Sequence, residues 1–298
     1  MQEVRMNNYL LKTKSLVKKY KDYHAVNEVS MTINQGDIYG FIGKNGAGKT
    51  TFIRMLTNLI EKSSGSIEFF NGKEKIKVGA VIESPACYPY LSAQENLNYY
   101  AIQMNLPDRK NRIKEVLEFI GLGSVGKKMF KDFSLGMKQR LGIGLAILNN
   151  PNLLILDEPT NGLDPQGIVE IREIIKKLNR EYKTTILVSS HILSELSMIA
   201  TRYGIIHQGK LIKEVTTQEL GNECKKTILL SSMDNQKCQN ILEKEGYVVN
   251  SDDVGLVVSA EKSEMPSISQ VLFNNQLYLT YFSYKEESLE DYYLKLTE

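Results

Sequence analysis

The stretch GKNGAGKT, from Gly43 to Thr50, decides the fold of this chain. The apolar run DIYGFI (Asp37–Ile42) directly before it is typical of a buried strand, and we expect a helix to run on from Thr51. A glycine-rich loop that ends in Gly-Lys-Thr between a strand and a helix has the spacing of a phosphate-binding loop. The sequence therefore predicts a site for a nucleoside triphosphate at a strand end of an α/β sheet.

The residue types of this loop suit phosphate binding. Glycines let the backbone turn its N–H groups toward phosphate oxygens, and the positive end of the next helix faces the same anion. Lys49 is expected to reach the β- and γ-phosphates, and Thr50 to offer its hydroxyl to Mg²⁺. The residues expected to contact the nucleotide here are Gly43, Asn45, Gly46, Gly48, Lys49, Thr50 and Thr51.

A second acidic motif, LLILDEP (Leu153–Pro159), follows the pattern of a buried strand that ends in two acids. Asp157 is the expected water-bridged partner of Mg²⁺. Glu158 comes next, points the other way if the strand continues, and could polarise a water for attack on the γ-phosphate. The plainer interpretation is a pair of acids that opens a loop, but the phosphate-binding loop upstream favours the catalytic one.

His191 follows another expected strand, TTILVSS (Thr184–Ser190). A single histidine is more often an ordinary surface or core residue. At the carboxyl end of a strand in a parallel sheet, however, it projects toward the ligand crevice, where it could contact the γ-phosphate.

The stretch FSLGMKQR (Phe133–Arg140) has no acid, histidine or cysteine, yet it places Ser134 and Gly136 at the start of an apolar helix. Ser134 could simply cap that helix. A transferring phosphoryl group also needs donors on its outer side. The Ser134 hydroxyl, the Gly136 N–H and the positive end of the helix could supply them.

The pattern along the chain indicates two parts. Up to about residue 224, strand-like and helix-like stretches alternate; Asn152–Leu156 and Tyr203–Lys210 are further expected strands. Between Ser92 and Asn150 the pattern is almost continuous helix, which we interpret as a helical insertion. Residues 225–298 read as β-α-β-β-α-β with a closing helix. Their expected strands are Lys226–Ser231, Tyr247–Ser251, Gly255–Ala260 and Leu277–Tyr284, with helices beginning near Asn235 and Met265.

Composition argues against a nucleic-acid-binding protein, a membrane-spanning protein and an exported protein. Residues 1–224 carry 30 basic against 23 acidic residues, and residues 225–298 carry 7 against 12. This surplus is too thin and scattered to indicate nucleic-acid binding, and the shift in charge suggests a boundary near Asn222–Lys225. No apolar run approaches the ~18 residues that span a bilayer. The N-terminal MQEVRMNNYLLKTK lacks the apolar core of a signal peptide, and the three cysteines show no metal spacing, so we expect reduced thiols.

With these motifs in this order, residues 9 to about 220 resemble the ATP-binding subunit of an ABC transporter. The resemblance implies a P-loop NTPase core at 9–221 with a helical subdomain at about 84–152, followed by a small α+β domain at 225–298. It also implies ATP hydrolysis with ATP and Mg²⁺ as cofactors. The partners that it implies are a second ATPase subunit, in the simplest case another copy of this chain, and separate transmembrane permease subunits. The expected location is the cytoplasmic face of the membrane.

The resemblance assigns further roles. Ser134 and Gly136 belong to the signature motif, which completes the ATP site of a second, head-to-tail subunit. Tyr20 stacks on adenine, with Tyr23 close enough to compete for that role. Asp164, in TNGLDP, is the residue that passes between the two sites.

The segment VIESPACYPYLSAQENL (Val81–Leu97) corresponds to the loop that senses γ-phosphate and touches the membrane subunit. Two positions depart from the common pattern. The signature has Leu135 and Met137 in place of glycine and glutamine. Glu83 stands where most of the family has glutamine, and we assign it to the nucleotide and the metal.

These departures, with the acidic ending SLEDYYLKLT, resemble the branch of bacitracin-type and lantibiotic self-protection exporters, whose ATPase is separate from its membrane subunits. We expect such an exporter motor. Alternatives are a soluble ABC ATPase that acts on nucleic acid or ribosomes, and a non-catalytic nucleotide switch. The first usually has two ATPase cassettes or a long coiled coil, whereas only 82 residues lie between Thr50 and Phe133.

Overall fold

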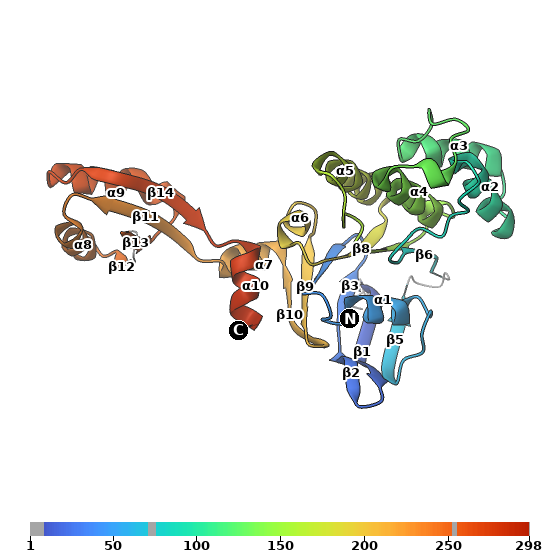
Figure 1. Ribbon diagram of the computed structural model, residues 1–298. Coiled ribbons are helices and arrows are strands. Elements are labelled where there is room, and N and C mark those ends of the chain that lie inside the picture. Colours follow the sequence, from blue (N-terminus) through green and yellow to red (C-terminus); the bar gives the residue numbers. More distant parts are fainter. Residues whose placement is uncertain (1–8, 71–75, 252–254, 298) are drawn as a thin grey trace, which may run out of the picture. The chain divides into compact units, whose positions relative to one another are not determined.

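The computed structural model describes residues 9–70, 76–251 and 255–297 (Figure 1). Residues 1–8, 71–75, 252–254 and 298 lie outside the described residues; they include the first part of the N-terminal segment and parts of the expected domain 225–298. The chain divides into two compact units, residues 1–217 and 218–298. This division lies a few residues before the boundary expected at Asn222–Lys225.

A six-stranded sheet forms the centre of the first unit, in the order β10-β9-β4-β8-β7-β6. Its strands β9, β4, β8, β7 and β6 run parallel, and β10 pairs antiparallel with β9 at the edge. All parallel strands therefore end at the same edge of the sheet. The strands are β4 (Ile38–Ile42), β6 (Val78–Val81), β7 (Leu153–Asp157), β8 (Thr185–Ser190), β9 (Arg202–His207) and β10 (Lys210–Thr216).

The expected strand Tyr203–Lys210 is wrong in its last part. The chain turns back at Gln208 and Gly209, which have φ of 48° and 78°, and β9 and β10 pair on either side of them as a hairpin. Two successive residues with positive φ are the mark of the tight two-residue turn that suits twisted strands.

A second, antiparallel sheet was not expected from the sequence. The long strand β1 (Tyr9–Tyr20) pairs with three partners: β2 (Tyr23–Val29), β3 (Thr32–Asn34) and β5 (Ser64–Phe69). β1 and β2 form a hairpin, whereas the pairing with β5 joins residues about fifty positions apart, which local patterns do not reveal.

The two sheets enclose the main core together with α1 (Lys49–Leu56). Alternate residues of the central strands face this core, among them Phe41 of β4 and Ile155 of β7, and they meet Phe52 of α1 and Leu11 of β1. This packing holds α1 directly behind the end of β4, so the loop between them has a rigid base on both sides.

Helices cover the other face of the six-stranded sheet. In α5 (Pro165–Tyr182), Ile171, Ile174, Ile175 and Leu178 are buried, which is one apolar stripe at helical spacing. The short α6 (Leu193–Ser197) lies near β4, because a Cβ on Gly40 would come within 3.4 Å of Leu196. Both strand faces are thus buried, which explains their near-continuous apolar sequences.

The helical insertion is present, with longer breaks than expected. It contains α2 (Ala93–Gln103), α3 (Arg109–Phe119), the 3₁₀ turn η1 (Phe130–Asp132) and α4 (Leu135–Ile147), which lie together in Figure 1. A complete capping box of Ser92 and Glu95 starts α2. The subdomain limits of about 84 and 152 stay a prediction.

The second unit is a small α+β layer structure of the expected β-α-β-β-α-β pattern. Its sheet has the order β12-β13-β11-β14, with all pairs antiparallel. Cys238, Leu242, Ile268 and Leu272 pack from the helices onto its core. The elements are α7 (Thr217–Glu223), β11 (Lys226–Ser232), α8 (Asn235–Lys244), β12 (Val248–Ser251), β13 (Leu256–Ser259), η2 (Lys262–Glu264), α9 (Met265–Asn274), β14 (Leu279–Glu286) and α10 (Leu289–Thr297).

Cys87, Cys224 and Cys238 are free thiols. Burial raises the pKa of Cys87 to about 12, so this thiol is uncharged near neutral pH and a poor nucleophile. Among the described residues, none of the helices has both the length and the apolar character needed to cross a bilayer.

Because each unit has its own core, we expect a chain that ends at Asn222 to keep nucleotide binding. The nucleotide loop and both acids lie in the first unit, and the described residues of its core cluster fall between Leu10 and Leu211. The dissociation constant for MgATP, measured by calorimetry, should stay within about threefold of the full-length value, since a domain with its own core can fold and bind alone. A folded truncated protein that loses nucleotide affinity by tenfold or more would contradict this assignment.

Candidate active site

The loop from Gly43 to Thr50 joins the end of β4 to the start of α1, as expected. Gly48 has φ of 106°, and a Cβ on it would lie 2.3 Å from the carbonyl oxygen of Ala25. Only glycine fits there. No side chain caps α1, so its first N–H groups are left for a ligand. The loop is therefore built to present backbone donors to an anion.

Lys49 lies at the bottom of this loop with its side chain only 6% exposed. Its Nζ donates to the carbonyl oxygens of Gly43, at 2.6 Å, and Lys44, at 3.3 Å, and lies 3.1 Å from Glu158 Oε1. A buried ammonium held by two carbonyls and a carboxylate is well placed to exchange the carbonyls for phosphate oxygens.

Asp157 is buried at the end of β7 and accepts hydrogen bonds on both carboxylate oxygens. Thr50 Oγ1 donates to its Oδ2 at 2.7 Å, and Ser189 Oγ donates to its Oδ1 at 2.5 Å. The Thr50 proton thus points to Asp157, which leaves the lone pairs of the hydroxyl oxygen for a metal ion. Thr50 and Asp157 are brought together as the sequence predicted.

This donor set fits Mg²⁺ that arrives with a nucleotide. Mg²⁺ keeps several waters and binds through one or two carboxylates plus phosphate oxygens, rather than in an all-protein cage. The described part of the chain contains no group of three or more His, Cys, Asp or Glu side chains placed to hold an ion. One hydroxyl and one carboxylate below a phosphate loop are what such a shared site needs.

Glu158 and His191 form a second pair at the same sheet edge. His191 Nδ1 lies 2.7 Å from Glu158 Oε2, while the buried Glu158 Oε1 lies 3.1 Å from Lys49 Nζ. Glu158 has φ of 50°, so the strand geometry does not continue through it. The expectation that Glu158 points away by strand alternation is therefore wrong in its reason. The left-handed backbone conformation of Glu158 sets the direction of its carboxylate, which His191 contacts.

Ser189 was not recognised from the sequence. Besides its bond to Asp157, its Oγ accepts the Glu158 N–H at 3.0 Å, so one hydroxyl holds the Asp157 carboxylate and the main chain of Glu158. A signal existed: Ser189 and Ser190 are two hydroxyl residues that follow the apolar run Ile186–Val188 in β8, and both are buried. Buried polar groups in such positions are almost always hydrogen-bonded to something specific.

Glu83 follows β6 at the same edge, yet its carboxylate does not meet Thr50 or Asp157. It pairs instead with Arg54 of α1, Nη2 to Oε1 at 2.6 Å. Its assignment to the nucleotide and the metal stays a prediction.

Ser134 and Asp164 both cap helices. Ser134 Oγ accepts from the Met137 N–H at 3.3 Å, and Asp164 Oδ1 accepts from the Gly167 N–H at 2.9 Å. The capping interpretation of Ser134 is thus present in the structure. Ser134 is nevertheless exposed, and Leu135 beside it is exposed by 51%. The start of α4 therefore stays accessible to another molecule.

Tyr20 and Tyr23, the two residues considered for stacking on adenine, are paired at the end of the β1–β2 hairpin, and that role stays a prediction. Tyr20 is 48% exposed and carries Lys18 Nζ 5.0 Å from its ring centroid, and Tyr23 is 60% exposed. Either ring can stack on a base. Asn45 is exposed in the phosphate loop, and Thr51 lies in the first turn of α1.

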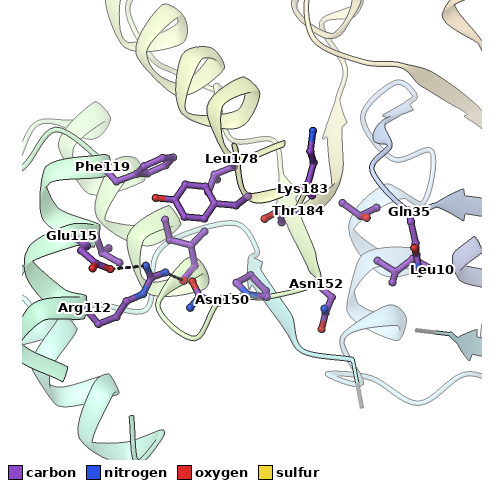
Figure 2. A pocket seen from close by; sticks show the side chains of 15 residues that line it. Leu10, Gln35, Arg112, Glu115, Phe119, Asn150, Asn152, Leu178, Lys183 and Thr184 are labelled. Carbon is purple, nitrogen blue, oxygen red and sulfur yellow. Dashed lines mark hydrogen bonds and ion pairs between the residues drawn. The ribbon is translucent and has the colours of Figure 1, made fainter. Parts of the chain in front are cut away.

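A separate pocket of about 450 Å³ lies at the amino ends of β7 and β8, the opposite edge of the sheet (Figure 2). Arg112 lines it but is already engaged, since it donates to the carbonyl oxygens of Ile147 and Leu148 at the end of α4. The lining contains none of the predicted site residues. The chemistry therefore belongs to the carboxyl edge.

Comparison with known proteins places this geometry in context. Residues 26–161 match the family model described as ABC transporter. The chain is 42% identical to the bacitracin transport ATP-binding protein BcrA of Bacillus licheniformis, over 96% of this chain and 97% of the relative. It is 46% identical to the lantibiotic transport ATP-binding protein SrtF of Streptococcus pyogenes, over 69% of this chain and 90% of the relative.

Solved structures of ABC transporter ATP-binding proteins have the same fold as the first unit. CbiO1 from Clostridium perfringens, part of the ABC transporter complex cbiONQ, superposes with a TM-score of 0.65 at 27% identity, covering 72% of this chain and 92% of that protein. The ATP-binding cassette MJ0796, solved as a dimer in a post-hydrolysis state with ADP and Pi, gives a TM-score of 0.63 at 25% identity, covering 70% and 99%.

Ser189→Ala should destabilise the fold, because it leaves the buried Asp157 Oδ1 without a donor. An unsatisfied buried acceptor costs about 1–3 kcal/mol in the free energy of unfolding, to be measured with urea. The matched control is Ser197→Ala, the same change at an exposed position, which should stay within about 0.5 kcal/mol of wild type. Equal losses in both variants would show that Ser189 does not hold Asp157.

Proposed function

The chain belongs to the ATP-binding proteins of ABC transporters and is an ATP-hydrolysing enzyme, and from this premise we propose that it powers a peptide-antibiotic exporter whose membrane part is a separate protein. One observation carries the proposal. The phosphate loop, Asp157 with its bond to Thr50, and the Glu158–His191 pair lie together at one edge of the sheet. The names of the relatives favour transport over a soluble machine that acts on nucleic acid or ribosomes.

In the proposed reaction, the loop N–H groups and Lys49 hold the β- and γ-phosphates, and Thr50 and Asp157 hold Mg²⁺, which neutralises phosphate charge when bound. Glu158 accepts a proton from the attacking water while the water oxygen bonds to the γ-phosphorus and ADP leaves. His191 holds one oxygen of Glu158. The other lies 3.1 Å from Lys49 Nζ and becomes available to that water when Lys49 turns to the phosphates. A switch that binds ATP without turnover would need no such carboxylate.

The proposed assembly is a head-to-tail pair of chains. Ser134 and Gly136 stand at the start of α4, in the helical insertion, whereas Lys49 stands at the start of α1, in the core. A signature motif on an accessible helix start can approach the γ-phosphate of a second copy. In this arrangement Asp164, at the start of α5, passes between the two sites.

The permease would dock beside the γ-phosphate-sensing loop at the cytoplasmic face of the membrane. A groove of about 960 Å³ lies there, lined by Ile82, Ser84, Pro85 and Ala86 of this loop together with parts of α2 and α4. Exposed apolar side chains gather along it: Leu59, Phe69, Val78 and Met104. Apolar surface of this kind marks interaction sites. The second unit, which contains no cluster of site residues in its described part, would regulate or dimerise.

The cargo class is taken from BcrA and SrtF, whose names assign them to bacitracin and lantibiotic transport. Cells that express this chain with its permease should tolerate more bacitracin or lantibiotic than cells with the permease alone. Glu158→Gln should abolish this protection, and the purified variant should bind ATP yet turn over at least ~10²-fold more slowly, the usual scale for losing a general base. Glu245→Gln, the same change at an exposed site, is the control.

Near-normal turnover by Glu158→Gln would remove Glu158 from its assigned role. An active wild-type ATPase that gives no protection against any such peptide would refute the cargo class.

Mixed pairs of inactive variants test the head-to-tail assembly. Ser134→Arg spoils the signature, and Lys49→Ala spoils the phosphate loop, so each variant alone has two damaged sites. A mixed pair has one intact site and one doubly damaged site. Mixing equal amounts should restore measurable ATP hydrolysis, because one of the two sites in each mixed pair works.

If both sites must act together, hydrolysis stays low, so ATP-driven dimerisation is measured as well. Ser134→Arg alone should bind ATP as a monomer. Dimers of this variant as abundant as those of wild type would mean that Ser134 only caps α4.

A further inference from the structure

Glu83 stands in an unusual local geometry. It follows β6 at the edge where the nucleotide site lies, and its φ of 60° is in the left-handed region that non-glycine residues avoid. Glu158, which follows the adjacent strand β7, shares this feature with φ of 50°. Strained residues persist where the surroundings hold them, and they gather at functional sites. What holds the Glu83 side chain is its ion pair with Arg54.

Arg54 lies four residues after Thr50 on α1. Residues four apart share one helix face, with Cβ atoms about 5–6 Å apart. This face therefore carries two contacts in succession: Thr50 meets Asp157, and one turn further on Arg54 meets Glu83. The Glu83 carboxylate is thus held about one helical turn from the Mg²⁺ position.

We propose that Arg54 is a positioning residue that holds Glu83 away from the metal, and that Mg²⁺ with ATP competes with Arg54 for this carboxylate. The inference rests on the proposed role of Thr50 and Asp157 at Mg²⁺. Glu83 then has two alternative partners, Arg54 and Mg²⁺, and the conformation of the loop after β6 depends on which of them it binds. A glutamine at this position could not choose in the same way, because an amide pairs far more weakly with a guanidinium.

The ion pair between Arg54 and Glu83 is exposed to solvent, so we expect it to break readily. The side chain of Arg54 is 38% exposed and that of Glu83 is 63% exposed. Exposed ion pairs are weak, so the competition should change metal affinity by about two- to fivefold rather than by orders of magnitude. A contact of this strength can hold the loop before the nucleotide arrives and release it afterwards.

The simplest alternative is that the charge of Arg54 repels Mg²⁺ directly. That effect would not need Glu83. A double-mutant cycle separates the two, since direct repulsion persists when Glu83 is replaced by glutamine, whereas competition disappears.

The experiment measures the Mg²⁺ concentration that gives half of the metal-dependent gain in affinity for AMP-PNP, a non-hydrolysable analogue, by calorimetry on the full chain. Arg54→Met should lower this concentration about two- to fivefold. Arg54→Lys, which keeps the charge, should stay close to wild type. In the Glu83→Gln background, Arg54→Met should cause no shift. Arg54→Gln is a second uncharged variant in case the methionine variant folds poorly.

A shift of equal size in the Glu83→Gln background, or no shift in either uncharged variant, would overturn the proposal. Thr50→Val separates this from a failure of the proposed site. If that variant leaves the Mg²⁺ requirement unchanged, the metal does not lie at Thr50 and the active-site assignment is wrong. If Thr50→Val raises the requirement while the Arg54 variants do nothing, only the role of Arg54 is refuted.

Discussion

The hydrogen bonds on the buried Asp157 carboxylate are the interaction on which the active site depends. Thr50 reaches it from α1 and Ser189 from β8, so one carboxylate ties together the phosphate loop and two neighbouring strands. A buried carboxylate is stable only while its oxygens are hydrogen-bonded. The need to satisfy this group therefore fixes the distance between the loop that binds phosphate and the strand that carries Glu158.

Around Asp157, the parallel strands bring the other site residues to one edge of the sheet, and residues with positive φ set the direction of two carboxylates. β6, β7 and β8 run parallel and end at one edge, so Glu83, Glu158 and His191 arrive at that edge from three different parts of the sequence. At Glu83 and Glu158 the chain leaves the strand with positive φ. The backbone directs each carboxylate, and basic side chains then hold it: Arg54 holds Glu83, and His191 and Lys49 hold Glu158.

Much of the fold was readable because its signals are local. The phosphate loop, the acids after β7 and the histidine after β8 each follow a short apolar run, and all were located correctly. The helices of the second unit begin at Asn235 and Met265, as expected. The failures involve pairing or geometry over a distance. The β1–β5 pairing was missed because its partners are far apart in sequence, and the turn at Gln208 was missed because a glutamine gives little sign of a positive φ.

The sequence by itself determined the class of chemistry. A Gly-Lys-Thr loop after a strand predicts phosphate binding. An Asp-Glu pair after a second strand then favours phosphoryl transfer among the functions of phosphate-binding proteins. Only the tertiary structure decided which atoms meet. It showed that Ser189 holds the Asp157 carboxylate and the Glu158 main chain, that His191 contacts the Glu158 carboxylate, and that Arg54 pairs with Glu83. The physical reason is that a motif reports the conformation of its own backbone, whereas a hydrogen bond between strands depends on the register of the sheet and on rotamers set by packing.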